Sequence, residues 1–108
     1  MKGEQGMIPL IIPSYEPDER LLQLLNTLRD YPFGPVLLVN DGSGPAYQTF
    51  FDRAKELLQE KLILLSHEVN RGKGRALKTA FAYVLEHFPD AAGCVTADSD
   101  GQHSAASG

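Results

Sequence analysis

The sequence has few of the residues that stabilise small secreted proteins or carry proteins into membranes. Its single cysteine, Cys94, cannot form a disulfide within the chain, and one cysteine with three scattered histidines lacks the spacing of a zinc site. The longest apolar run, residues 8–12, contains a proline and is far shorter than the ~20 residues of a membrane-spanning helix. The N-terminus has no hydrophobic signal segment. These absences predict a soluble protein of a reducing compartment, the cytoplasm.

Positive charge is also in the minority. Ten Lys and Arg residues against fourteen Asp and Glu residues give a net charge of −4. The overall charge therefore does not favour binding to nucleic acid or to an anionic membrane. Apolar residues make up 43% of the 108 residues and charged residues 22%, which is typical of a globular domain. We expect one domain, or a piece of one, in which any anion-binding site must be local.

Short apolar segments alternate with segments of helical periodicity. The apolar segments are nearly continuous, as strands buried on both faces are, and they cover residues 8–13, 35–40, 61–67 and 93–98. Helices are predicted between them, from Pro17 to the Tyr31-Pro32 pair, from about Pro45 with Ser43 or Gly44 as cap, and from about Gly74 to His87. The order β-α-β-α-β-α-β predicts an α/β protein with an open, mainly parallel sheet.

Several burial states follow from this assignment. The last helix is expected to bury its apolar side, which consists of Leu77, Ala80, Phe81, Val84 and Leu85. Cys94 lies within the fourth predicted strand, and we expect it to be a small buried apolar side chain. His67 and His87 have no partner nearby in the sequence, so both are expected to be structural or solvated.

Polar clusters follow all four predicted strands. They occupy residues 14–16, 41–43, 70–75 and 98–103. The carboxyl ends of parallel strands joined by right-handed crossovers lie along one edge of the sheet, where open α/β proteins bind ligands. Four polar clusters at that edge predict a binding site.

The last cluster offers oxygen ligands. Asp98 and Asp100 follow a strand directly, and Gln102 adds a neutral oxygen two residues later. Such oxygens suit Mg²⁺ or Mn²⁺ held together with a diphosphate. The alternative is a pair of solvated loop acids that cap a turn.

The other clusters also have two interpretations each. Residues 70–75 place three cations and two glycines at a helix start. The cations oppose the helix dipole, so one interpretation is that an anion binds there, and the other is that they are simply solvated. Asp41 can contact a ligand or only form a turn and helix cap. Tyr15 can stack on a base and Glu16 can accept a ribose hydroxyl, or Tyr15 packs and Glu16 favours the next helix start.

Together the four motifs resemble the family 2 glycosyltransferases, and among them the dolichyl- or polyprenyl-phosphate sugar synthases. The resemblance rests on Ile12 to Glu16, Val39 to Ser43, Asn70 to Leu77 and Thr96 to His103. It implies a GT-A fold, whose N-terminal half is a Rossmann-like open sheet. It also implies a nucleotide-diphosphate-sugar donor, UDP- or GDP-linked, and inverting transfer to an acceptor such as a lipid phosphate or a polysaccharide.

The resemblance also implies roles for individual residues. The nucleoside would lie against Pro13, Tyr15 and Glu16, with Asp41 on the base. Glu16 and Pro17 depart from the family, which usually has Asn after the tyrosine. Arg71 and Lys73 lie in the motif near the donor diphosphate, and either of them could contact it. Mn²⁺ or Mg²⁺ would be held by Asp98, Asp100 and Gln102, with Asp98 also facing the ribose.

The resemblance assigns no catalytic base within the chain. Residues 1–103 are then the nucleotide-sugar-binding half of a GT-A domain, and residues 104–108 are a frayed tail or a truncation end. We expect this chain alone to lack the acceptor site, and the full-length parent can lie at the cytoplasmic face of a membrane. Two other functions stay open: a nucleotidyltransferase, or a non-catalytic nucleotide-binding or assembly module that forms homo-oligomers through an open sheet edge.

Overall fold

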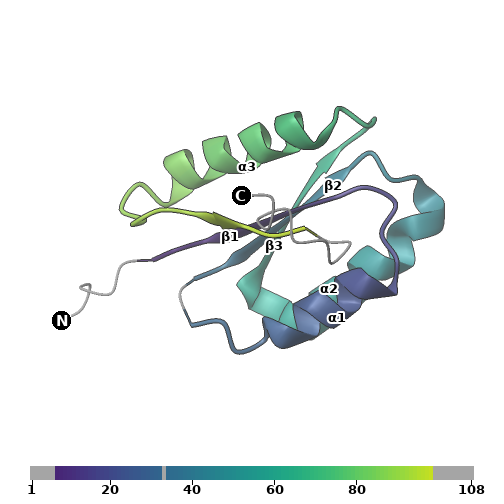
Figure 1. Cartoon of the computed structure of the whole chain (residues 1–108), viewed down its shortest axis with the longest axis horizontal. Coiled ribbons are helices and arrows are strands. Elements are labelled where there is room, and N and C mark those ends of the chain that lie inside the picture. Colours follow the sequence, from purple (N-terminus) through teal and green to yellow (C-terminus); the bar gives the residue numbers. More distant parts are fainter. Residues whose placement is uncertain (1–6, 33, 99–108) are drawn as a thin grey trace.

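The computed structural model describes residues 7–32 and 34–98 and has a parallel four-stranded sheet at its centre (Figure 1). Its strand order is β3-β2-β1-β4, and all three neighbouring pairs are parallel. The strands are β1 (Leu10–Ser14), β2 (Val36–Asp41), β3 (Leu62–His67) and β4 (Val95–Thr96). The predicted α/β class and its open parallel sheet are confirmed.

Helices cover both faces of the sheet. Helices α1 and α2 lie on one face and α3 lies on the other (Figure 1). The α-helices are α1 (Glu19–Thr27), α2 (Gln48–Leu58) and α3 (Lys73–His87), and short 3-10 turns at Pro45–Tyr47 and Gln59–Lys61 flank α2. No helix in the described part of the chain is both long and apolar enough to cross a lipid bilayer.

The core consists of two layers because side chains alternate along each strand. On one face of the sheet, Ile12 and Leu38 pack with Leu21 of α1 and Phe51 of α2. On the other face, the strand residues Ile11, Leu37 and Val39 pack against Ala76, Ala80 and Val84 of α3. Because all neighbouring strands are parallel, the carboxyl ends of the four strands lie along a common edge of the sheet.

The first helix starts later than the sequence predicts. Pro17 is not its first residue, because Asp18 is the N-cap and α1 begins at Glu19. The Asp18 carboxylate accepts a hydrogen bond from the backbone N–H of Arg20 at 2.9 Å, which satisfies one of the free donors of the first turn. The second helical segment begins at Pro45 with Gly44 as its cap, in agreement with the prediction.

The buried side of α3 is narrower than predicted. Ala76, Ala80 and Val84 are its buried residues, whereas Phe81 is 40% exposed and Leu85 is 75% exposed. Among the described residues, α3 is the single helix on its face of the sheet, so only the stripe that points straight at the strands is covered. The expected burial of Phe81 and Leu85 is therefore wrong.

The fourth strand is short and lies at an edge of the sheet. It spans two residues, not residues 93–98. Within the described residues it pairs with β1 alone, through hydrogen bonds such as Val95 N–H to Pro9 O at 3.0 Å. Cys94 is exposed, against expectation, because the strand begins only at Val95 and Cys94 lies outside it.

Candidate functional site at the carboxyl edge of the sheet

The strand order creates a switch point between β1 and β4. The chain adds β2 and β3 on one side of β1 and then returns to place β4 on the other side. Ligands of open α/β sheets bind in the crevice outside such a point. Tyr15 and Glu16 follow β1, and Asp98 closely follows β4, so these predicted site residues flank the switch point. Pro13 is buried within β1, opposite Val39 of β2.

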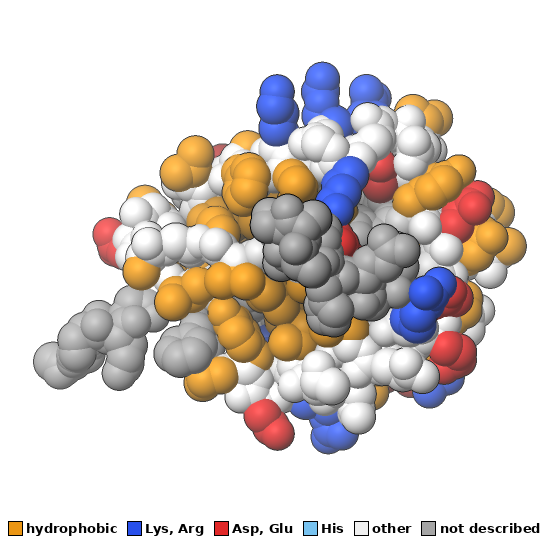
Figure 2. All heavy atoms as spheres, viewed as in Figure 1, with side chains coloured by type: hydrophobic (Ala, Val, Ile, Leu, Met, Phe, Trp, Pro, Cys, Tyr) orange, Lys and Arg blue, Asp and Glu red, His pale blue; other side chains and the backbone are white. Residues whose placement is uncertain are grey.

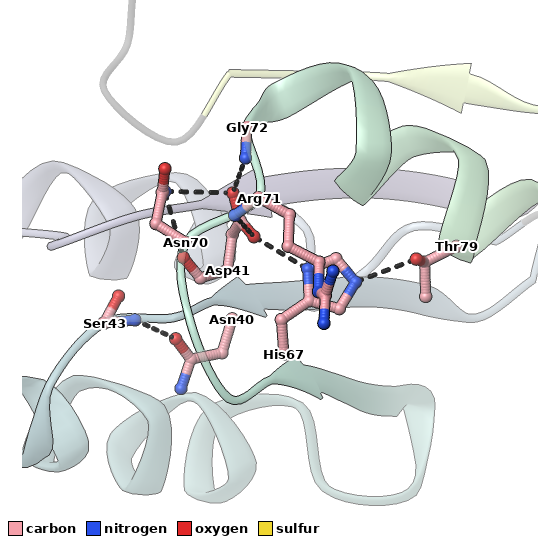
Figure 3. A network of polar contacts seen from close by, with 8 residues as sticks. All are labelled: Asn40, Asp41, Ser43, His67, Asn70, Arg71, Gly72 and Thr79. Atoms are coloured by element: carbon pink, nitrogen blue, oxygen red, sulfur yellow. Dashed lines mark hydrogen bonds and ion pairs between the residues drawn. The ribbon is translucent and has the colours of Figure 1, made fainter.

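Asp41, the last residue of β2, is the centre of a polar network (Figure 3). Its side chain is 3% exposed. Oδ1 accepts hydrogen bonds from His67 Nδ1 at 2.7 Å and from the backbone N–H of Arg71 at 3.0 Å. Oδ2 accepts from Asn70 Nδ2 at 3.1 Å and from the backbone N–H of Gly72 at 2.9 Å. Each carboxylate oxygen therefore has two partners within the chain.

These partners decide the charge of Asp41. Burial by itself would raise the pKa of this carboxyl group, but the hydrogen bonds from His67, Arg71 and Gly72 outweigh burial and lower the pKa below its ordinary value. Asp41 is therefore an anion at neutral pH. A nucleotide base that bonds to Asp41, the role implied by the resemblance, must replace one of the four internal bonds, and that role stays a prediction.

Gly42 allows the third motif to come close to the second. Its φ is +78°, a conformation that glycine adopts without steric cost. A Cβ atom at this position would lie 2.1 Å from the backbone nitrogen of Asn70 and 2.3 Å from the carbonyl carbon of Val69. The turn at residues 69–72 therefore lies directly on the backbone that follows β2.

His67 and Thr79 belong to this network, and the sequence motifs did not indicate either of them. His67 is the last residue of β3 and pairs in register with Asp41. Its Nε2 lies 2.8 Å from Thr79 Oγ1 of α3. The signal that could have found His67 is positional, because parallel strands that end together bring their last side chains to the same place. His67 is largely buried rather than solvated, and it has partners that the sequence did not indicate.

The first motif is tied to the second by a separate chain of hydrogen bonds. The backbone N–H of Glu16 donates to Ser43 Oγ at 2.8 Å, and the backbone N–H of Ser43 donates to Asn40 Oδ1 at 3.0 Å. Glu16 itself has a positive φ of 50°. A hydrogen bond with the Glu16 carboxylate raises the pKa of the exposed Tyr15 phenol. Of the predicted nucleoside contacts, Tyr15 and Glu16 are thus on the surface and next to the second motif.

The third and fourth motifs meet through an ion pair. Lys73 Nζ donates to Asp98 Oδ1 at 2.7 Å, with the Lys73 side chain 56% exposed and that of Asp98 15% exposed. Figure 2 shows that Lys and Arg side chains gather over α3, at the top of the view. This helix carries Lys73, Arg75 and Lys78, so positive charge is concentrated locally on an acidic chain.

Only part of the predicted metal site can be placed. Asp98 lies at the expected edge, but Asp100 and Gln102 are outside the described residues. Within residues 7–32 and 34–98, no three His, Cys, Asp or Glu side chains form a group that could hold a metal ion. The described part of the site thus supplies one carboxylate, and the metal stays a prediction.

Known proteins match this chain over most of its length. The profile of glycosyl transferase family 2 matches residues 10–106. The UDP-N-acetylglucosamine–dolichyl-phosphate N-acetylglucosaminyltransferase of Methanococcus voltae is 31% identical over an alignment 115 residues long. The alignment covers 90% of this chain and 42% of that enzyme. An uncharacterised protein of Methanocaldococcus jannaschii is 28% identical over 95 residues, 87% of this chain and 35% of that protein. The chain spans less than half the length of both relatives.

Proposed function

The chain belongs to glycosyl transferase family 2, and we propose that it forms the donor-binding part of a transferase that uses a nucleotide-diphosphate sugar. The observation that carries the proposal is the meeting of the cationic start of α3 with Asp98 beside the topological switch point. A nucleoside on the β1 side, near Tyr15 and Glu16, would extend its diphosphate toward Lys73.

The start of α3 has the chemistry that a diphosphate requires. No side chain caps this helix, and its first turn has no acidic residue. Lys73 and Arg75 place positive charge where the helix dipole is already positive, an arrangement that an anion relieves. The glycines at positions 72 and 74 leave open space around the backbone, since a Cβ at either position would meet no atom within 4 Å.

A divalent metal fits Asp98 by the nature of its donor atoms. The carboxylate is a hard oxygen ligand, largely buried at the end of the β4 segment, and Mg²⁺ and Mn²⁺ prefer such ligands together with phosphate oxygens. Asp98, Asp100 and Gln102 would hold the ion. When bound, the metal supplies Lewis-acid stabilisation of the leaving diphosphate. Lys73 adds positive charge at the same place.

The relative from Methanococcus voltae suggests which donor and acceptor to test first. Its name specifies UDP-N-acetylglucosamine and dolichyl phosphate. We therefore take UDP-N-acetylglucosamine as the first donor and a polyprenyl phosphate as the first acceptor for the whole protein. Because this chain spans 42% of that enzyme, we assign donor binding to it and expect the catalytic base and the acceptor site in sequence that has no counterpart here.

Calorimetric titration tests the proposal directly. The purified chain is titrated with UDP, GDP, UDP-N-acetylglucosamine and UTP, each with and without Mn²⁺. Asp98→Asn removes the carboxylate at the site. Asp90→Asn is the matched control, because Asp90 is an exposed acid in the turn after α3, at the other end of that helix.

The proposal predicts metal-dependent binding of a nucleoside diphosphate or its sugar, lost in Asp98→Asn and kept in Asp90→Asn. A clear preference for UTP over the diphosphate sugar would instead favour a nucleotidyltransferase. Absence of binding to every nucleotide, by a chain whose folding is verified by circular dichroism, would overturn the donor function.

A further inference from the structure

We propose that His67 is a positioning residue of the donor site, which holds Asp41 and through it the turn formed by residues 70–72. The inference rests on the proposed function, because this turn leads directly into Lys73 and the start of α3. His67 itself lies below the turn and is not required to touch a ligand.

The imidazole of His67 joins three elements of the fold. It projects from the end of β3, its Nδ1 bonds to Asp41 at the end of β2, and its Nε2 bonds to Thr79 in the second turn of α3 (Figure 3). The side chain is only 10% exposed. Because Asp41 is ionised and accepts, Nδ1 carries a proton and donates to it. In a neutral ring Nε2 then accepts from the Thr79 hydroxyl, so both ring nitrogens have partners.

The remaining bonds of Asp41 all go to the turn. Oδ1 is shared between His67 and the Arg71 amide, while Oδ2 binds the Asn70 side chain and the Gly72 amide. Without the His67 donor, Oδ1 keeps one bond and the carboxylate loses one of the four contacts that restrict its rotation. The two bonds at Oδ2 depend on the same rotation, so loss of the His67 bond loosens the hold of the carboxylate on the turn.

Besides the Asp41 carboxylate, two other contacts hold the turn: the Asn70 side chain donates to the backbone carbonyl oxygen of Asp41 at 3.1 Å, and residues 69–70 pack on Gly42. Residues 68–72 belong to no helix or strand, and Val69 is 57% exposed. The backbone carbonyl of Gly72 accepts the N–H of Ala76 at 3.0 Å, so the placement of Gly72 also sets where α3 begins. A buried polar network that supports an exposed cationic turn has a purpose other than core packing, since apolar residues would fill the same space at lower cost.

Three variants of the whole chain separate positioning from general stability. His67→Leu removes both polar contacts, whereas His67→Asn keeps a side-chain N–H that can donate to Asp41 and so serves as the conservative rescue. His87→Leu is the matched control, because His87 is an exposed histidine that stacks on Tyr83 at the far end of α3. The readouts are amide hydrogen exchange by NMR and calorimetric affinity for UDP with Mn²⁺.

For His67→Leu we expect the exchange protection of the Arg71 and Gly72 amides, relative to amides of β2, to fall about tenfold to hundredfold, the value of a hydrogen bond to a charged group. UDP affinity should fall by a similar factor. His67→Asn should recover most of both losses, and His87→Leu should change neither.

Unchanged relative protection of the two amides in His67→Leu would overturn the positioning role, even if the variant unfolds more easily. Lost protection with unchanged UDP affinity would show that the turn does not serve the donor, which also overturns it. If the unaltered chain binds no nucleotide, the donor function fails, and lost amide protection in His67→Leu would then leave His67 as an anchor of the turn alone.

Discussion

Replacing Gly42 with alanine tests whether the close contact between the second and third motifs holds the site together. An alanine Cβ would lie 2.1 Å from the nitrogen of Asn70, 2.3 Å from the carbonyl carbon of Val69 and 2.7 Å from the Asn70 Cα. All three neighbours are backbone atoms, so no side chain can rotate away. The segment at residues 69–70 must move, and with it the amides that bind Asp41.

Two effects determine the magnitude. Alanine at a φ of +78° costs about 1–2 kcal/mol in backbone strain. Displacing packed backbone costs about 1–3 kcal/mol more, by analogy with overpacking of protein interiors. We therefore expect Gly42→Ala to lower the free energy of unfolding by about 2–5 kcal/mol.

Two other glycines provide matched controls. Gly72 also has a positive φ, 95°, with ψ 157°, but a Cβ there meets no atom within 4 Å, so Gly72→Ala should lose only backbone strain, about 1–3 kcal/mol. Gly74 lies in the first turn of α3 with similar open space, so Gly74→Ala should gain about 0.5–1 kcal/mol of stability. Urea unfolding followed by circular dichroism measures all three. Equal losses in Gly42→Ala and Gly72→Ala would refute the steric argument.

Three further predictions concern charge and assembly. Because the pKa of Asp41 is lowered in the folded state, its ionised carboxylate contributes stability that is complete above about pH 4, the ordinary range of an aspartate, and is lost as the pH falls through the folded-state pKa. In urea unfolding between pH 7 and pH 3, the free energy of unfolding of Asp41→Asn should therefore fall less than that of the unaltered chain. Lys73→Gln should tighten the binding of Mn²⁺ alone, because the ammonium group no longer competes for Asp98, and it should weaken the binding of UDP with Mn²⁺. Lys78→Gln is the control for the lost charge. Equal Mn²⁺ affinities of Lys73→Gln and the unaltered chain would contradict the competition. If the open edge at β4 makes the chain an assembly module, sedimentation should show a dimer or larger species independent of nucleotide, and a monomer at high concentration argues against it.

The centre of the fold was predictable because β1 and β2 are buried on both faces of the sheet. Residues such as Leu37 and Val39 lie between helix layers, so their segments are apolar throughout and stand out in the sequence. Predictions failed where burial depends on how many neighbours an element has. Phe81 and Leu85 fit the apolar pattern of α3, but one helix on one sheet face covers a single stripe of side chains. Likewise Cys94 fits a strand pattern, yet β4 begins only at Val95 and leaves Cys94 outside it.

The candidate site was predictable at the level of its location. Polar residues directly after apolar strands mark the carboxyl edge, and the structure places Tyr15, Asp41, Lys73 and Asp98 there. The contacts between them were not predictable, because they depend on register. Asp41 and His67 pair only because β2 and β3 end together, and no spacing within one motif contains that information.

The network around Asp41 also explains how the cationic turn is stable before any ligand arrives. The start of α3 has no acidic residue of its own to balance Lys73 and Arg75. Asp41, at the end of β2, supplies a negative charge near the helix start and accepts hydrogen bonds from the backbone amides of Arg71 and Gly72 there. On this side the site is preformed and buried. On the β4 side, the exposed Lys73 and the largely buried Asp98 form a pair in which each neutralises the other. A diphosphate and a metal would have to separate them before either residue could bind its ligand. Donor binding would therefore rearrange the Lys73 side and leave the Asp41 side in place.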